Sequence, residues 1–319
     1  MDTRRRRVAG GLATVGLGWA LGARAQPAGA FPSRPLRMIV PYPPGGSTDI
    51  LARGFVEQLS RQLGQPVVID NRPGASTNIG TEAAARSTPD GYTVYFGTSG
   101  LATNPHFGPV PTIDVFRDLT PVGMIASMSF MVAANPAVAI SDAASLVALA
   151  RSRPGRVTIA SASLDTQVKT LNRRAGIELM HVPYKGGAQA AADAMAGHVD
   201  TVIALVPVLL PHLRSGKLRP VAVAAPKRSG ALPDVPTFPE GGVAGYPGPS
   251  WFALFAPAGV PEPILARLSA ASQAAAGAPE LVAQMTAQGI DMQGGTAAEL
   301  GERLRRDHAE QAELFKELR

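Results

Sequence analysis

The sequence predicts an α/β protein whose chain forms two lobes joined by two crossings. From Leu36 onward, short apolar runs alternate with segments of helical period, a pattern typical of folds with largely parallel sheets. The 319 residues exceed the usual size of a single domain. The order of the segments indicates that the C-terminal part returns to the first lobe, so that a middle lobe is inserted within it.

The first part of the chain is predicted to form βαβ units. Its apolar runs are separated by amphipathic stretches and by a turn signal at residues 89–91, where proline, aspartate and glycine follow one another. The expected strands are 36–40, 67–69 and 92–97, and the expected helices are 50–63 and 79–87.

A second series of alternating segments begins after Pro121. Its expected strands are 122–125, 130–134, 157–160, 201–205 and 221–225, and its expected helices are 141–152, 167–175 and 188–197. After a Pro- and Gly-rich stretch we expect a strand at 251–256, helices at 262–276 and 280–288, and a last amphipathic helix that carries Leu300, Leu304, Leu314 and Leu318.

This order sets the expected domain limits. Residues 26–124 and 227–319 are assigned to the first lobe, and residues 125–226 to the second. Ligands of open α/β sheets bind beyond the carboxyl ends of the strands. We therefore expect the loops after the first and third strands to face the middle lobe across a ligand cleft.

The N-terminus has the features of a signal peptide. Four arginines, Arg4 to Arg7, precede a weakly apolar run, and Ala23, Arg24 and Ala25 form an A-x-A cleavage site. The run is too short and too polar to span about 30 Å of hydrocarbon. We expect export to the periplasm with cleavage of residues 1–25 near Ala25, by either the Sec or the twin-arginine route.

Composition excludes several functional classes. The chain has no cysteine, which rules out disulfides, thiolate metal sites and cysteine nucleophiles. Residues 1–25 carry five of the 30 basic and one of the 24 acidic residues, so the remainder has 25 basic against 23 acidic residues. A nearly neutral chain with 5% aromatic residues lacks the basic stripe that nucleic-acid binding needs.

Two loops offer donors for an anion. The sequence PYPPGGSTD at 41–49 joins the first strand to the first helix, and Ser47 or Thr48 can cap that helix while its free N–H groups face a ligand. We expect Gly45 and Gly46 to allow close approach of the backbone to the ligand, and Gly46 to require a positive φ. A plain strand–helix turn is the alternative, with Asp49 as a partner of the helix dipole. The stretch GTSG at 97–100 supplies similar donors after the third strand.

Signatures of enzymes and metal sites are missing from the sequence. It contains no G-x-S-x-G, G-x-x-x-x-G-K-[ST], H-E-x-x-H or G-x-G-x-x-G pattern. The five histidines are spaced in ways that suit no standard metal cluster. We therefore expect no metal site and no enzymatic turnover.

Seven stretches in order resemble the tripartite tricarboxylate transporter substrate-binding proteins, the Bug family. They are PYPPGGSTD (41–49), DNRPGA (70–75), NIG (78–80), PDGYT (89–93), HVPYKG (181–186), LPDVPTFPE (232–240) and WFALFAP (251–257). The resemblance implies a type II periplasmic-binding-protein fold and a small carboxylate ligand, which is a mono-, di- or tricarboxylate or an amino acid-like compound. It also implies a periplasmic receptor that serves membrane transport subunits, with no cofactor and no turnover.

The resemblance also implies which residues hold the ligand carboxylate, chiefly through backbone N–H groups, hydroxyls and waters. First-lobe contacts carried over from the family are Tyr42, Pro44, Gly45, Gly46, Ser47, Thr48, Asp49, Thr98 and Ser99. Second-lobe contacts are Ser161, Ser163, Thr166, Tyr184, Lys185, Gly186 and Asp200. For Tyr184 and Lys185 a turn with a solvated lysine is the alternative. The glycine-free loop at 161–167 is shorter than the family's usual Gly- and Ser-rich loop.

Three functional classes stay open on the sequence alone. A carboxylate-binding transport receptor, expected to be a monomer, is favoured. A sensor that reports a ligand to a membrane signalling partner would use the same site. An exported enzyme on a related fold needs a positioned nucleophile or acid–base pair, for which the cleft loops offer only Asp49, Lys185, Asp165 or Asp200.

Overall fold

A computed structural model describes residues 31–108, 111–162, 164–246 and 248–318. The expected signal peptide, residues 1–25, lies outside the described residues, and so does Ser163. Within the described ranges, no helix combines the length and the apolar character needed to cross a membrane.

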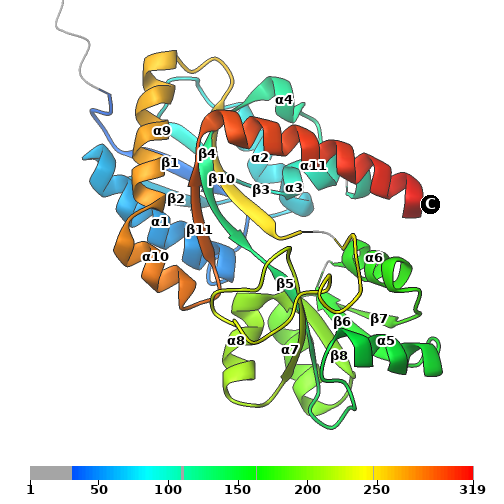
Figure 1. Cartoon of the computed structure of the whole chain (residues 1–319). Helices are drawn as coiled ribbons and strands as arrows, with labels where there is room; N and C mark the ends of the chain where they lie inside the picture. Colours follow the sequence, from blue (N-terminus) through cyan, green and yellow to red (C-terminus); the bar gives the residue numbers. More distant parts are fainter. Residues whose placement is uncertain (1–30, 109–110, 163, 247, 319) are drawn as a thin grey trace, which may run out of the picture. The chain divides into compact units, whose positions relative to one another are not determined.

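The first sheet has six strands in the order β11-β4-β10-β3-β1-β2 (Figure 1). Strands β1, β2 and β3 are parallel, whereas β10 runs antiparallel to both β3 and β4, and β11 antiparallel to β4. The strand bounds are β1 Leu36–Val40, β2 Val67–Asn71, β3 Thr93–Thr98, β4 Leu119–Met128, β10 Ser250–Pro257 and β11 Asp291–Gly295. The C-terminal segment therefore contributes two strands to the sheet that the N-terminal segment begins.

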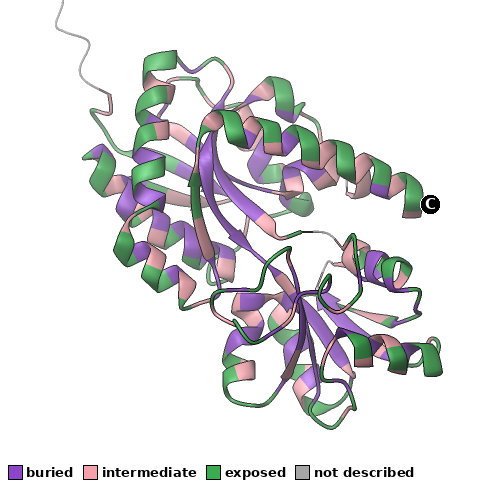
Figure 2. Ribbon diagram, in the orientation of Figure 1, coloured by how far each residue is buried: buried purple, intermediate pink, exposed green. Residues whose placement is uncertain are grey.

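Helices cover both faces of this sheet, because successive strand residues point to opposite sides. Met38 and Val40 pack with α1 and α9, whereas Ile39 packs in a second cluster with Trp251 and residues of α3 and α11. The helices are α1 Ser47–Leu63, α2 Asn78–Ala85, α3 Gly100–Phe107, α4 Val115–Asp118, α9 Glu262–Ala276, α10 Pro279–Thr286 and α11 Ala297–Leu318, with a 3-10 turn η1 at Ala75–Thr77. Figure 2 shows β4 and β10 as buried strands, whereas the edge strand β11 is exposed or half-buried.

The second sheet has five strands in the order β7-β6-β8-β5-β9. Strands β6, β7 and β8 are parallel, and β5 runs antiparallel to β8 and β9. The strands are β5 Phe130–Ala134, β6 Thr158–Ala162, β7 Met180–Tyr184, β8 Thr201–Leu205 and β9 Arg219–Ala224. Its helices are α5 Ala143–Ser152, α6 Asp165–Ala175, α7 Gly187–Ala196 and α8 Val206–Arg214. Apolar clusters on its two faces give this sheet a core of its own.

The chain passes between the sheets twice. Strand β4 belongs to the first sheet as far as Met128, and β5 begins in the second sheet at Phe130, so the first crossing lies between these two residues. The expected strand 122–125 is therefore shorter than the observed strand β4. The chain leaves β9 at Ala224 and re-enters the first sheet at Ser250. The assignment of lobes to the ranges 26–124, 125–226 and 227–319 stays a prediction.

Candidate functional site

The loop between β1 and α1 presents two exposed glycines at the edge where the parallel strands end. Gly45 has φ +90°, whereas Gly46 has φ −81° and ψ 170° and directly precedes the helix. The expectation of a positive φ at Gly46 is therefore wrong, and Gly45 is the residue whose conformation only glycine adopts readily. A Cβ atom added at Gly46 would have no neighbouring atom within 4 Å, so the space that a side chain would occupy there is open.

The Asp49 carboxylate is hydrogen-bonded to this loop. It accepts hydrogen bonds from the Gly45 N–H at 2.9 Å, from Arg53 Nε at 2.7 Å and from Asn71 Nδ2 at 3.2 Å, and only 3% of the side chain is exposed. Burial by itself raises the pKa of Asp49, but the hydrogen bonds from Arg53, Gly45 and Asn71 outweigh it and hold the pKa below its ordinary value. The acceptor capacity of Asp49 thus goes to shaping the loop.

No side chain caps α1 among the described residues, so neither Ser47 nor Thr48 fills the capping role expected for it. Thr48 is buried, Ser47 is half-buried and Pro44 is exposed. The first N–H groups of this 17-residue helix therefore lie at the sheet edge without a capping side chain, where the helix dipole favours a negative charge.

The loop after β3 meets both the first loop and the start of β10. The Tyr42 hydroxyl lies 3.3 Å from the Thr98 hydroxyl, and burial raises the pKa of Tyr42. The Ser99 hydroxyl lies 2.7 Å from the hydroxyl of Ser250. The first pair joins the loop after β1 to the end of β3, and the second joins the residue after β3 to the start of β10.

In the second sheet, Ser161 belongs to a chain of hydrogen-bonding groups. Its hydroxyl lies 2.7 Å from His181 Nε2, and His181 Nδ1 lies 3.3 Å from Asp165 Oδ1. The histidine tautomer decides which of the two groups, the Ser161 hydroxyl or His181 Nε2, donates in their hydrogen bond. Ser161 is fully buried, so its hydroxyl serves this chain of groups and is closed to solvent.

The remaining second-lobe residues of the predicted site fall in different places. Tyr184 donates a 2.6 Å hydrogen bond to Asp193 Oδ2, which raises the pKa of Tyr184. Lys185 is exposed, and Gly186 directly precedes α7. Asp200 precedes β8, at the opposite end of that strand, and its carboxylate accepts bonds from the N–H and hydroxyl of Thr158 at 2.7 and 2.8 Å. The structure therefore does not bring Asp200 to the edge where the other residues lie.

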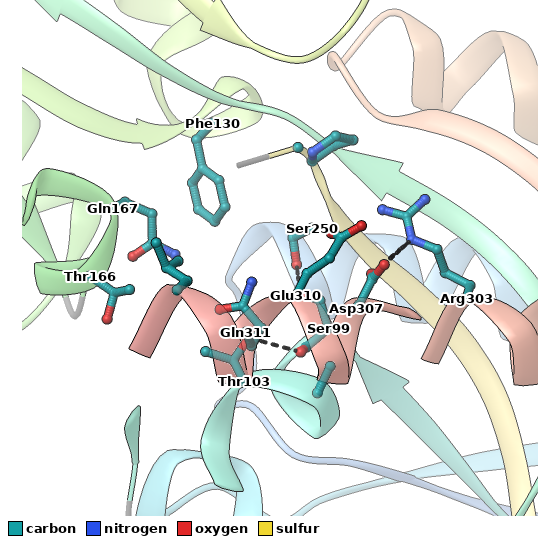
Figure 3. A pocket seen from close by; sticks show the side chains of 14 residues that line it. Ser99, Thr103, Phe130, Thr166, Gln167, Ser250, Arg303, Asp307, Glu310 and Gln311 are labelled. Carbon is teal, nitrogen blue, oxygen red and sulfur yellow. Dashed lines mark hydrogen bonds and ion pairs between the residues drawn. The ribbon is translucent and has the colours of Figure 1, made fainter. Parts of the chain in front are cut away.

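A pocket lies between α3 and α11 of the first sheet and α6 of the second (Figure 3). Two predicted residues, Ser99 and Thr166, line it from opposite sides. Its other walls come from residues that the sequence did not single out, namely Thr103, Phe130, Gln167, Ser250, Arg303, Asp307, Glu310 and Gln311. Most of these lie on α11 or at the start of β10, and no local motif marks them. In the described part of the chain, no group of three or more His, Asp or Glu side chains is arranged to hold a metal ion.

Two α/β sheets, two crossings, and polar loops at the strand ends define a solute-binding receptor of the periplasmic type. Residues 51–318 match the model of the tripartite tricarboxylate transporter family receptors. The chain belongs to this family, which confirms the resemblance seen in the sequence and the expected fold class.

A similar protein and two solved structures support the same assignment. The chain is 37% identical to protein BugT of Bordetella pertussis over 87% of this chain and 88% of BugT. It is 32% identical to a protein of R. palustris solved with adipate, with a TM-score of 0.82 over 90% of this chain and 98% of that one. It is 28% identical to MatC of Rhodopseudomonas palustris with bound malate, with a TM-score of 0.77 over 89% of this chain and 100% of that one.

Proposed function

We propose that this protein captures a small carboxylate for a membrane transporter of the tripartite tricarboxylate type. The observation that carries the proposal is the sheet edge at which the first turn of α1 lies beside Gly45 and Gly46 without a capping side chain. Tyr42, in the same loop, lies 3.3 Å from the Thr98 hydroxyl of the loop after β3. Backbone N–H groups at a helix N-terminus together with hydroxyl donors suit a carboxylate and need no arginine. The adipate and malate of the two solved relatives belong to the same chemical class.

The second lobe completes the proposed site through Thr166, Lys185 and Gly186. Thr166 lies in the first turn of α6, and Gly186 precedes α7, so two further helix starts follow parallel strands of the second sheet. Ser161 contributes indirectly, because its hydroxyl is already bonded to His181. Asp200 is left out of the proposal, since its carboxylate is bonded to Thr158 at the other end of the sheet.

The proposal is tested by identifying and titrating the ligand. Gently purified protein is denatured, and mass spectrometry of the released small molecules is expected to find a carboxylate. The same compound should raise the melting temperature of ligand-free protein. At a ligand concentration of 100 times Kd, binding should add about 2.7 kcal/mol to the free energy of unfolding. Absence of any carboxylate, in the released fraction and in titrations, contradicts the proposal.

Transport and sensing use the same binding site and are separated by a cellular experiment. Cells that lack this chain should lose uptake of the labelled ligand and regain it on complementation. Unchanged uptake, with loss of a transcriptional response to the ligand, would instead support the sensor. We also infer export with cleavage near Ala25, which intact-mass analysis of the periplasmic protein tests.

One observation favours a second candidate function, ester or amide hydrolysis. The order Ser161, His181, Asp165 is that of a catalytic triad, with 2.7 Å between the serine and histidine atoms. The full burial of Ser161 opposes this candidate, because a nucleophile has to reach its substrate. A fluorophosphonate probe and a panel of activated esters should therefore leave the protein unlabelled and unconverted. Labelling that is lost in Ser161→Ala would establish the hydrolase.

A further inference from the structure

The pocket between α3, α6 and α11 continues the proposed carboxylate site. Ser99 and Thr166 belong both to the predicted ligand-binding residues and to the walls of this pocket. A ligand whose carboxylate is held at the strand ends therefore extends toward α11. The chemistry of that helix decides which group the far end of the ligand can carry.

The one arginine among the lining residues is already paired. Arg303 Nε lies 2.8 and 2.7 Å from the two oxygens of Asp307 (Figure 3). Asp307 Oδ2 also accepts a 2.8 Å hydrogen bond from Trp251 Nε1. Only 14% of the Asp307 side chain is exposed, so this pair is held in a fixed geometry against the buried indole. The charges of Arg303 and Asp307 offset each other, and Arg306 Nε also lies 3.7 Å from Asp307 Oδ1.

Glu310 gives the pocket its remaining charge. It lies one turn beyond Asp307 on α11, and 65% of its side chain is exposed. Its ion-pair partner, Arg306, lies 4.0 Å away, is 58% exposed and is not among the residues that line the pocket. The rest of the polar lining consists of neutral hydroxyls and amides, such as those of Thr103 and Gln311. The net charge of the lining residues is therefore negative.

A negative wall rejects a second carboxylate and accepts a cation or a hydroxyl. Resting on the function proposed above, we propose that this receptor selects monocarboxylates that carry an ammonium or hydroxyl group at their far end, and that Glu310 is the residue that discriminates against dicarboxylates. An ammonium group is attracted to Glu310, whereas a carboxylate at the same place is repelled by it. Hydroxyl and amide groups of the lining satisfy either an ammonium or a hydroxyl.

Matched ligand pairs test this selectivity. Calorimetric titrations at pH 7 and low ionic strength compare succinate with 4-aminobutanoate and 4-hydroxybutanoate, and adipate with 6-aminohexanoate and 6-hydroxyhexanoate. Within the chain length that binds, the amino or hydroxy acid should bind at least about tenfold more tightly than the dicarboxylate. Equal or tighter binding of the dicarboxylate in both sets overturns the inference and leaves the carboxylate receptor standing. If no probe binds and no carboxylate copurifies, the proposed function fails, and this inference fails with it.

Two variants and a matched control assign the selectivity to one residue. Glu310→Gln should reduce the preference, and Glu310→Lys should shift it toward the dicarboxylate by at least about tenfold relative to wild type. Glu302→Gln removes the same charge from an exposed position of α11 that lines a different hollow, and it should leave the preference unchanged. An equal shift in Glu302→Gln, or none in Glu310→Lys, overturns the role given to Glu310.

Discussion

Replacing Asp49 by asparagine tests whether a buried carboxylate holds the loop before α1. The side chain is 3% exposed and accepts bonds from the Gly45 N–H, from two nitrogens of Arg53 and from Asn71 Nδ2. Asparagine has one acceptor oxygen and a donor amide of its own. In the variant the amide therefore faces at least one of the donors that now point at the carboxylate.

The expected loss of stability in Asp49→Asn follows from the hydrogen bonds that the carboxylate accepts. A bond to a charged group contributes about 1.5 to 3 kcal/mol. The Arg53 side chain is 56% exposed, so solvent screens its part of the interaction. We therefore expect Asp49→Asn to lower the free energy of unfolding by about 2 kcal/mol at pH 7.

The pH dependence of the free energy of unfolding provides a second, independent test of Asp49. The pKa of Asp49 is lowered in the folded protein, so its stabilising contribution is complete above the unfolded value of about 3.9 and is lost as pH falls through the folded value. The difference in stability between wild type and Asp49→Asn should accordingly shrink below about pH 4.

Urea unfolding of ligand-free protein at pH 7, 4 and 3 measures both effects. Asp234→Asn, the same change at an exposed loop carboxylate, serves as the control and should stay within about 0.5 kcal/mol of wild type. Ligand affinity of Asp49→Asn should also fall, because Gly45 loses its anchor. A difference at pH 7 no larger than that of the control, or one that persists undiminished at pH 3, refutes the assignment of Asp49 as the support of the loop.

Two further predictions concern backbone conformation and a half-buried histidine, His106. Gly45→Ala should lower the free energy of unfolding by about 1 to 2 kcal/mol, because Gly45 has φ +90°. Gly46→Val, at φ −81° and with open space for its side chain, should stay within about 0.5 kcal/mol of the wild-type stability but bind the ligand about tenfold less tightly. Chemical denaturation measures the stability and calorimetry the affinity. Burial, and then the neighbouring ring of His308, lower the pKa of His106, so acidification through about pH 6.5 should destabilise wild type more than His106→Leu. Equal falls in melting temperature from pH 7 to pH 5 would contradict the second prediction.

The missed elements show where local sequence signals mislead. Strand β7 contains Pro183, which normally argues against a strand, but β7 is an edge strand of its sheet and has no need of that N–H. Helices α3 and α8 contain Pro105 and Pro211, and both were left out of the expected elements. Strand β11 ends in two glycines and is also an edge strand, so its pairing with β4 depends on a partner distant in sequence.

The sequence alone predicted an α/β fold and the loop at Gly45 and Gly46, because strand period, helix period and turn chemistry are local properties of the chain. The family followed from the resemblance of seven motifs in order. Only the tertiary structure decided what those loops face. The hydrogen bond between Ser99 and Ser250 joins residues 151 positions apart, and it exists because β10 runs antiparallel to β3. The place of Glu310 in the pocket likewise depends on how α11 packs against α3, which no pattern within either helix encodes. Packing between distant elements selects which donors and charges meet, so the chemistry of the pocket had to be read from the fold.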